Sequence, residues 1–313
     1  MNNKLQILFM MIVFLAVSCI GLNASGGEAL LLTELGTSAR MIGLGNIEGF
    51  EDGAATIFEN PAGLKRVKGL SIAAFGTKLM GEVDYRNIGV ALETDFGAFG
   101  IGFMDASVGG IPHTMQVSGW YDIEYYYRYE NMLGKLAYGL GINEWLQVGC
   151  AANYYKNSMD SYSSEGWNLD VGMIMELEPL EVSLVGKNVL RSLKLKYEDS
   201  SDSNYSGEES YPYMIVLGGK YNLGDFDILG QVKGREDRSR NLINLGLHYS
   251  PWFLKLLHMY GGYKEYFGTK NVLHIQTLGV GLNLFGLRVD YAYENCDHVD
   301  YSTNHYMSLS MAF

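Results

Sequence analysis

The sequence predicts an all-β protein, a transmembrane antiparallel β-barrel of about 14 strands with an N-terminal plug segment in the lumen. Three observations predict this class. From about residue 68 onward, apolar residues alternate with small, polar or charged ones, which is the pattern of strands with one apolar face. The alternating segments are about ten residues long, which suits a tilted strand crossing a bilayer. Short turns also alternate with longer loops, as they do at the two ends of an outer-membrane barrel.

The composition narrows the classes of protein further. Of the 313 residues, 48% are hydrophobic and 19% are charged, whereas charged residues make up about a quarter of an ordinary soluble protein. The apolar content excludes intrinsic disorder. The formal net charge is −12, and this acidic balance excludes a nucleic-acid partner, which needs a basic surface. A soluble β-rich protein and a membrane barrel remain, and the three observations above favour the barrel.

The chain begins with the pattern of a secretory signal peptide. Lys4 precedes the apolar run 5–22, and small residues follow at 23–26, which is the order of the charged, apolar and cleavage regions. A spanning helix is the alternative, but the Gly-rich segment that follows has no Lys or Arg cluster to stop transfer. We therefore predict a signal peptide over residues 1–24, cleavage near Ala24, and a mature protein in the bacterial outer membrane.

Residues 25–66 are predicted to form the plug segment, ahead of a barrel over residues 67–313. A segment this small and apolar fits inside a wide barrel, which would otherwise hold an open aqueous channel. Asp52 is predicted to cap a short helix over residues 53–58. The chain therefore divides into a removable leader, a plug and a wall.

Arg40 lies within the plug segment and needs acidic partners if it is buried there. The candidates are Glu51, Asp52, Asp170 and Asp290. One hypothesis makes Arg40 part of a gate, and the other makes it half of an anchoring ion pair. We favour the ion pair, because charged pairs with perturbed environments are often structural.

The wall is predicted from the alternating segments. One of them places Leu278, Val280, Leu282 and Leu284 on one face, with small or polar residues on the other. An even number of strands returns both ends of the wall to the periplasmic side, where the short turns are expected. The predicted strands cover about residues 68–77, 84–94, 97–106, 131–142, 145–157, 166–178, 181–189, 212–223, 226–235, 241–250, 256–265, 272–284, 286–295 and 304–313.

A Tyr-rich run lies in the long connection between the third and fourth predicted strands. Tyr, Trp and Arg dominate the energetic hot spots of protein interfaces, so this run is a candidate partner-contact surface. The aromatic belt of the barrel, extended into an external hairpin, explains the run equally well. The residues concerned are Trp120, Tyr121, Tyr125, Tyr126, Tyr127, Arg128 and Tyr129.

The sequence offers no motif for catalysis. The six His residues are scattered without a Ser/Asp or Cys partner pattern, and we find no nucleophile, acid–base pair or phosphate-binding loop. No CxxC, HExxH or Cys/His cluster is present, so neither a metal site nor a cofactor is predicted. Cys19 follows the residues LAVS, which faintly resemble a lipoprotein box with Leu one place too far upstream. Cys150 and Cys296 lie far apart, and nothing in their context requires that they pair.

Two segments carry a resemblance to a known family. The final strand ends in Phe with apolar residues at alternate positions, and it resembles the insertion signal read by the barrel assembly machinery; the residues are Met307, Leu309, Met311 and Phe313. The plug segment contains Gly36, Arg40, Gly43, Gly45, Asp52, Asn60, Pro61, Ala62, Gly63 and Leu64. This set, with NPAGL as its most specific part, resembles the start of the PorV/PorQ family of outer-membrane β-barrels, which is related to the FadL long-chain fatty acid transporters. With the strand spacing included, the resemblance covers nearly the whole mature chain. Asn46 and Gly53 depart from the residues usual in the family.

The resemblance implies a function in one of two classes. PorV-type barrels are accessory proteins of type IX secretion, which meet exported cargo at the translocon barrel and pass it to the cell-surface attachment machinery. The partners would then be that barrel and the C-terminal domains of secreted cargo, with outer-membrane lipid around the wall. FadL-like transport of a hydrophobic small molecule through an apolar lumen is the alternative. The predicted lumen-facing residues are mainly Gly, Ala, Ser, Asn and Asp, which favours the secretion role.

Overall fold

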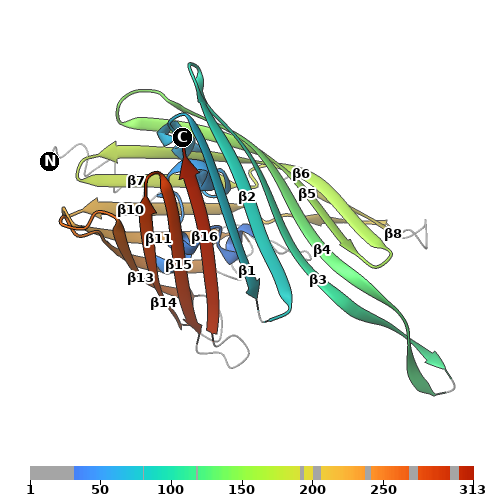
Figure 1. The fold of residues 1–313 in the computed structure, drawn as a ribbon. Helices are drawn as coiled ribbons and strands as arrows, with labels where there is room; N and C mark the ends of the chain where they lie inside the picture. The colour runs from blue at the N-terminus through green and yellow to red at the C-terminus, as the bar shows by residue number, and fades with distance from the viewer. Residues whose placement is uncertain are drawn as a thin grey trace.

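The computed structural model describes residues 32–79, 81–117, 119–190, 194–199, 206–236, 241–267, 274–296 and 303–313. Fourteen of the strands in these ranges form the wall of a closed antiparallel barrel (Figure 1). They are β1 (Leu70–Leu79), β2 (Val83–Thr94), β3 (Gly97–Val117), β4 (Trp120–Gly141), β5 (Leu146–Met159), β6 (Tyr162–Leu177), β7 (Leu180–Lys187), β10 (Met214–Asn222), β11 (Phe226–Arg235), β12 (Asn241–Tyr249), β13 (Leu257–Phe267), β14 (His274–Leu284), β15 (Leu287–Cys296) and β16 (Thr303–Ala312). The sheet closes because β1 pairs with β16 as well as with β2. The predicted transmembrane barrel of fourteen strands is confirmed.

Side chains along each wall strand alternate between the lumen and the exterior. On β2, Tyr85, Asn87 and Ala91 are buried, whereas Ile88 and Leu92 are exposed. Such exposed apolar side chains continue around the wall and suit contact with lipid. Among the described residues, no helix is long and apolar enough to cross a membrane.

The connection predicted as a loop over residues 106–131 is instead strand. Beyond Ser107 of β3 and Tyr129 of β4, these two strands pair with no other strand among the described residues than each other. Residues 108–117 and 120–128 form this external ribbon, which extends far beyond the rest of the wall (Figure 1). The ribbon is exposed on both faces, so its sequence lacks the one-sided apolar alternation from which the other strands were predicted.

A second connection also contains strand. The segment between β7 and β10 holds the short strands β8 (Lys194–Asp199) and β9 (Ser206–Ser210), which pair with each other. β8 also pairs with the first residues of β6, at the end of the barrel that carries the long connections. We call this the loop end, and the opposite end, with its short connections, the turn end.

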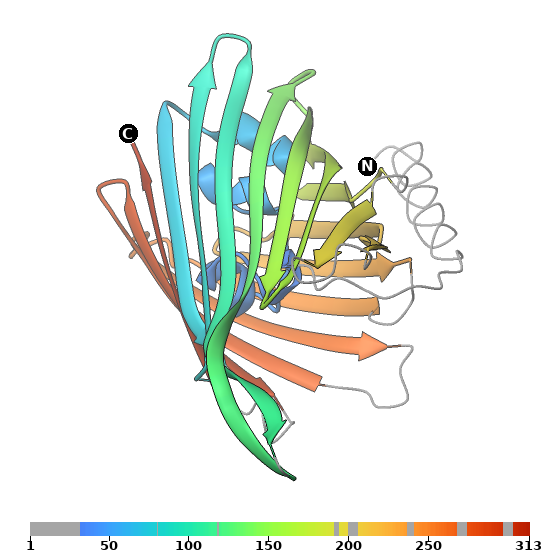
Figure 2. The ribbon, with the colours of Figure 1, turned by 90° about the vertical axis from the view of Figure 1, so that its right-hand side faces the viewer.

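The plug lies inside the barrel (Figure 2). Its described part, from residue 32 onward, contains four short helical elements, η1 (Leu32–Leu35), α2 (Ala39–Gly43), η2 (Gly53–Phe58) and η3 (Pro61–Arg66). The element α2 packs against β13–β16, η2 against β1–β4 and β16, and η3 against β3–β6. The plug therefore contacts the wall on both sides of the seam between β1 and β16.

Polar side chains set where these elements begin. Ser38 caps α2, because its hydroxyl accepts a hydrogen bond from the Met41 amide at 3.0 Å. Asn60 caps η3 in the same way, through the Ala62 amide. The predicted cap at Asp52 is wrong, since its side chain makes no capping bond. Its carboxylate instead accepts a hydrogen bond from the guanidinium of Arg40.

Candidate functional site: the plugged lumen

Glycines let the plug backbone approach the wall closely. At Gly262 of β13, an added Cβ atom would overlap the backbone of Gly45 and Leu44, and at Gly149 of β5 it would overlap the backbone of Pro61. Gly45 has a φ of +75°, a conformation that glycine adopts without the strain of a side chain. Wall and plug are thus fitted to each other at positions where no side chain has room.

The residues that carry the PorV/PorQ resemblance lie together in the plug. Asn60 Nδ2 donates a hydrogen bond to Ser183 Oγ of β7 at 2.8 Å, while Asn60 Oδ1 accepts from the Ala62 amide at 3.0 Å. This side chain therefore fixes both the start of η3 and its position on the wall. Asp52 is exposed, and the other nine residues of the set are buried: Gly36, Arg40, Gly43, Gly45, Asn60, Pro61, Ala62, Gly63 and Leu64.

Glu48 anchors the middle of the plug to β7 and β11. Its carboxylate pairs with Lys187 and, at 2.7 Å, with Lys233, and all three side chains are at most 5% exposed. Gln231 adds two hydrogen bonds to the Glu48 backbone, at 2.7 and 3.2 Å. Buried charges are stable only when they are paired. The sequence analysis missed this anchor, although acidic and basic residues at lumen positions are the signal for it.

Arg40 makes its ion pairs within the plug. Its Nη1 lies 3.1 Å from Glu51 and 3.4 Å from Asp52. The other two candidates have different partners, because Asp170 pairs with Lys135 at 2.7 Å and Asp290 with Arg288 at 3.0 Å. Arg40 therefore joins α2 to the segment before η2, and this geometry fits the anchoring hypothesis.

Glu59 is a buried acid at the centre of the plug. Its carboxyl accepts hydrogen bonds from the Gly49 amide at 2.8 Å and the Thr37 hydroxyl at 3.1 Å. Burial, together with the negative charges of Glu51 and Glu48, raises the pKa of this carboxyl well above its ordinary value. The plug interior therefore favours the protonated form of Glu59.

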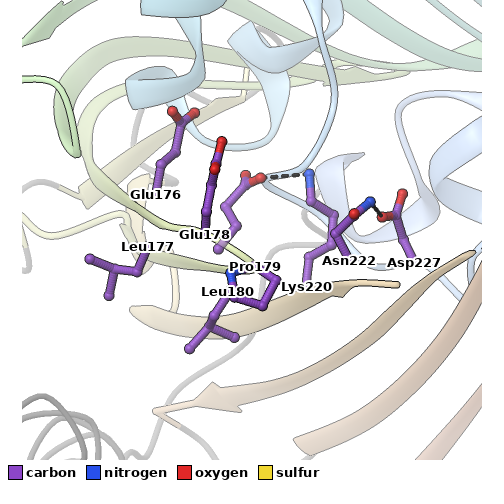
Figure 3. Close-up of a pocket in the computed structure, with 9 residues that line it drawn as sticks. Glu176, Leu177, Glu178, Pro179, Leu180, Lys220, Asn222 and Asp227 are labelled. Carbon is purple, nitrogen blue, oxygen red and sulfur yellow. Dashed lines mark hydrogen bonds and ion pairs between the residues drawn. The ribbon is translucent and has the colours of Figure 1, made fainter. Parts of the chain in front are cut away.

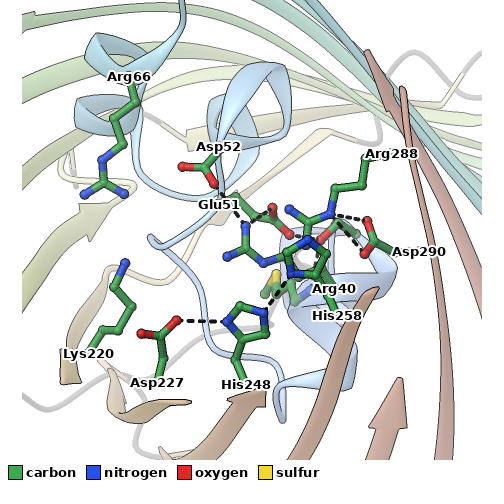
Figure 4. Close-up of polar contacts among 12 residues, drawn as sticks. Arg40, Glu51, Asp52, Arg66, Lys220, Asp227, His248, His258, Arg288 and Asp290 are labelled. Atoms are coloured by element: carbon green, nitrogen blue, oxygen red, sulfur yellow. Dashed lines mark hydrogen bonds and ion pairs between the residues drawn. The ribbon is translucent and has the colours of Figure 1, made fainter. Parts of the chain in front are cut away.

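The turn end of the lumen is polar and open to water. The Asp52 side chain is 66% exposed although it lies inside the barrel. Around it, Figure 4 shows Arg66, Arg288 and a chain in which His248 lies 2.8 Å from Asp227 and 3.0 Å from His258. We call this region the turn-side chamber.

A pocket of about 710 Å³ opens from the rim of the turn-side chamber (Figure 3). Most of its charged residues are paired, since Lys220 lies 2.5 Å from Glu181 and Arg66 also pairs with Glu181 and Glu176. A chamber of paired charges holds water rather than an apolar ligand. The pocket is lined by Glu176, Leu177, Glu178, Pro179, Leu180, Glu181, Lys220, Asn222 and Asp227.

The loop end of the lumen is apolar and aromatic. Phe75 of β1 stacks on Tyr306 at a centroid distance of 6.1 Å, and Tyr155 lies 3.9 Å from Tyr211. The expectation of a lumen lined mainly by small and polar residues did not include this cluster, which lies beside buried polar residues such as Asn153 and Asn168. We call these buried residues the loop-side cluster: Leu32, Phe75, Leu79, Tyr85, Met104, Leu133, Tyr155, Tyr211, Met214 and Tyr306.

The loop-side cluster touches the plug directly. The Tyr85 hydroxyl donates to the carbonyl oxygens of Leu32 and Gly36, at 3.1 and 2.7 Å. A molecule bound among the residues of the loop-side cluster would thus lie against the start of the plug. Sequence reasoning missed the cluster because its members come from the loop-side halves of many strands, and each strand contributes only one or two.

The other predicted residues lie outside the lumen. In the external ribbon, Trp120, Tyr121 and Tyr126 are exposed, and the Tyr125 hydroxyl donates to Asp160 at 2.8 Å. The ribbon residues Tyr127, Arg128 and Tyr129 lie nearer the wall. The C-terminal residues Met307, Leu309, Met311 and Phe313 are exposed on the lipid-facing side. Cys150 is a free, exposed cysteine.

The described residues contain no group of three or more His, Cys, Asp or Glu side chains that could hold a metal ion. The predicted signal peptide over residues 1–24 lies outside the described residues, and its cleavage stays a prediction. Chemically, the lumen has a packed cluster of apolar and aromatic side chains at one end, a polar chamber open to water at the other, and a plug that contacts both.

Comparison with known proteins supports this architecture. The fold is similar to that of the CymD monoaromatic hydrocarbon channel, with a TM-score of 0.62 and 14% sequence identity over 91% of this chain and 99% of that one. It is also similar to the Pseudomonas putida toluene transporter TodX (TM-score 0.61, 12% identity, 93% and 100% covered). A Pseudomonas aeruginosa FadL homologue gives a TM-score of 0.58 and 11% identity, with 91% and 99% covered.

The sequence itself matches no protein-family model and no curated protein. At such low identity, the likenesses to solved structures show the fold alone. They neither support nor test the PorV-type secretion role, which stays a prediction from the plug segment.

Proposed function

We propose that this protein is an outer-membrane channel for the uptake of small hydrophobic molecules. The observation that carries the proposal is the loop-side cluster, a set of buried apolar and aromatic side chains at the end of the lumen that faces away from the short periplasmic turns. Apolar side chains around a concave space are the usual lining of a site for a hydrophobic ligand. The proteins with the same fold include channels and transporters named for toluene and monoaromatic hydrocarbons.

The order of environments along the lumen suggests the route. A hydrophobic molecule gains free energy by leaving water for the loop-side cluster. There it lies against the start of the plug, which is held by Tyr85 and farther down by Glu48. Displacement of the plug would open the way to the turn-side chamber, where water and paired charges favour release of an apolar molecule. The plug must therefore move for transport to occur.

A polar substitution in the loop-side cluster tests this route. Met104 of β3 is fully buried there, and Met104→Gln keeps the length of the side chain while placing an amide in the apolar space. We expect uptake of toluene to fall about tenfold, because the unpaired amide makes the space less favourable for a hydrocarbon. The measurement is the accumulation of radiolabelled toluene by bacteria that lack other hydrocarbon channels.

Met115→Gln is the matched control, since Met115 is exposed on the external ribbon. It should leave toluene uptake unchanged. Heat-modifiable gel migration of both variants shows whether the barrel has formed. Equal uptake through the wild-type protein and Met104→Gln would contradict the proposed route, and no uptake above background in the wild type would contradict the function.

A secretion role remains the second candidate, because the external ribbon presents aromatic residues that no described part of the chain covers. Trp120 is 81% exposed and Tyr121 76%. An isolated two-stranded hairpin is marginally stable in water, and a partner that covers it would stabilise it. The ribbon is thus the surface on which a secretion partner would be expected.

Removal of the external ribbon separates the two functions. Val108 and Tyr129 are paired in register, so a two-residue Asn-Gly turn can join them in place of residues 109–128. We expect this variant to form a barrel and to take up toluene at the wild-type rate. Loss of secreted cargo from the surface of native cells that carry the variant, with toluene uptake also absent from the wild type, would reverse the ranking.

A further inference from the structure

The wall strands β5 and β6 carry neutral polar side chains that face the lumen beside the loop-side cluster. Asn153 and Asn168 are directly opposite each other in register, and so are Asn157 and Ser164, each four residues away along its strand. Asn153 is fully buried, and Asn168 and Ser164 are each 3% exposed. We call these four residues the amide block.

Several polar atoms of the amide block have no hydrogen-bond partner. They are the Oδ1 of Asn153, the Oδ1 of Asn157, the Oγ of Ser164 and the Nδ2 of Asn168. The orientation of Asn168 is fixed, because its Oδ1 accepts from the amides of Leu169 at 2.8 Å and Leu190 at 3.1 Å. Its Nδ2 is left as a donor. A buried polar group without a partner destabilises the fold, so four residues with such groups side by side require an explanation.

The unpaired atoms define the chemistry of a ligand group that would satisfy them. The block offers donors from Asn168 and Ser164, and acceptors from Asn153, Asn157 and Ser164. A hydroxyl group both donates and accepts, so it complements this set. A hydrocarbon would leave every atom of the set unpaired.

A carboxylate fits the amide block less well. It only accepts hydrogen bonds, and it would lie near the acceptor oxygens of Asn153 and Asn157. The cation opposite Asn153 in register is Lys135, and its ammonium is 2.7 Å from Asp170. Because Lys135 already pairs with Asp170, its charge is not available to a bound carboxylate. The block is therefore suited to a neutral group.

The position of the amide block places it at the edge of an aromatic space. Tyr155, which lies between Asn153 and Asn157 on the same face of β5, packs against Tyr211 at 3.9 Å. A ring bound among these aromatic side chains could place a substituent on the block. The block is closed in this conformation, because Asn153 has no exposed surface. Binding therefore requires side chains at this wall to move apart.

We propose that the amide block binds the hydroxyl group of an otherwise apolar ligand, so that the channel selects phenols and related alcohols over plain hydrocarbons and carboxylates. This inference rests on the proposed uptake function, and it names the substrate class of the same lumen. A site with buried polar groups discriminates against a ligand that lacks the matching group, because those groups are then left unpaired.

Three fluorinated probes test the proposal: 4-fluorophenol, 4-fluorotoluene and 4-fluorobenzoate. The first two differ only in a hydroxyl group in place of a methyl group of similar size. Titrations of the detergent-solubilised full chain are followed by ¹⁹F NMR, with protein-free micelles as the blank. We expect the phenol to bind about tenfold more tightly than either other probe, because only the phenol pairs the atoms of the block.

Asn153→Leu is the informative variant, because leucine has nearly the shape of asparagine and no polar atoms. We expect it to reduce the preference for the phenol over the toluene probe to less than about twofold while keeping the toluene affinity. Its resistance to heat should equal or exceed that of the wild type, whereas a residue with a purely structural role would lower it. Asn283→Leu, at an exposed position near the turn end, is the matched control and should keep the preference.

The outcomes separate this inference from the proposed function. Equal binding of the phenol and toluene probes by the wild type would contradict the proposed binding of a hydroxyl group by the amide block. It would leave the proposed uptake of hydrophobic molecules intact. A phenol preference that persists in Asn153→Leu would contradict the proposed binding of the hydroxyl group as well. Failure of all three probes to bind would overturn both the block and the proposed uptake of small hydrophobic molecules.

Discussion

Gly262→Val should open the barrel to ions. The glycine faces the plug, and an added Cβ atom would overlap the backbone of Gly45 and Leu44, which cannot turn aside as a flexible side chain could. The plug is therefore expected to leave this part of the wall, and an unfilled barrel of this size conducts water and ions. We expect single-channel conductance in planar bilayers to rise at least about tenfold above that of the wild type.

Gly261→Val provides a close control for this variant. Gly261 is the preceding residue on β13, and a Cβ atom there meets nothing within 4 Å. Its side chain would point to the lipid-facing side, where an apolar residue is favourable. Conductance should stay at the wild-type level. If Gly262→Val conducts no better than Gly261→Val while both migrate as folded barrels, the plug is not held at this contact.

Glu48→Gln should release the middle of the plug from the wall. The change leaves Lys187 and Lys233 buried without the carboxylate that now pairs with both. Breaking a buried ion pair by removing one partner costs about 3–5 kcal/mol. Amide hydrogens of the plug that exchange by undocking should therefore exchange about a hundredfold faster or more, which hydrogen-exchange mass spectrometry can measure.

The control for Glu48→Gln is the same substitution at Glu178. This residue is exposed in the turn between β6 and β7, so its loss of charge should leave plug exchange unchanged. Exchange in the wall strands reports on the barrel itself and should be the same in both variants. Unaltered exchange of the plug in Glu48→Gln would show that other contacts with the wall, such as that of Asn60 with Ser183, hold it without this anchor.

The fold could be predicted because the strands of a membrane barrel require apolar residues at every second position of the sequence. Residues such as Leu278, Val280 and Leu282 must all face lipid, so the alternation that predicts a strand is enforced by one continuous environment. The external ribbon was predicted only as one of two alternatives, for the opposite reason. Residues 120–128 face water on both sides, so no alternation is required of them, and their strand conformation comes from pairing across the hairpin.

The lumen was harder to predict than the wall. The sequence analysis identified Arg40 and its partners Glu51 and Asp52, because these residues are close together in the chain. It missed Glu48 with Lys187 and Lys233, which are brought together only when the sheet closes. The loop-side cluster was missed for the same reason, so the prediction of the lumen lining left out its apolar and aromatic part. Long-range contacts between single residues leave no periodic signal.

The position of the plug has a consequence for how the protein is assembled. The plug precedes all wall strands in the chain, and it contacts β1 and β16, which meet only when the cylinder is complete. Its fit at Gly262 and Gly149 leaves no space through which a folded segment could slide past the finished wall. We therefore expect the final pairing of β1 with β16 to form around a plug already in place. The segment that blocks the mature lumen would then also serve, during insertion, as the surface on which the last strands find their register.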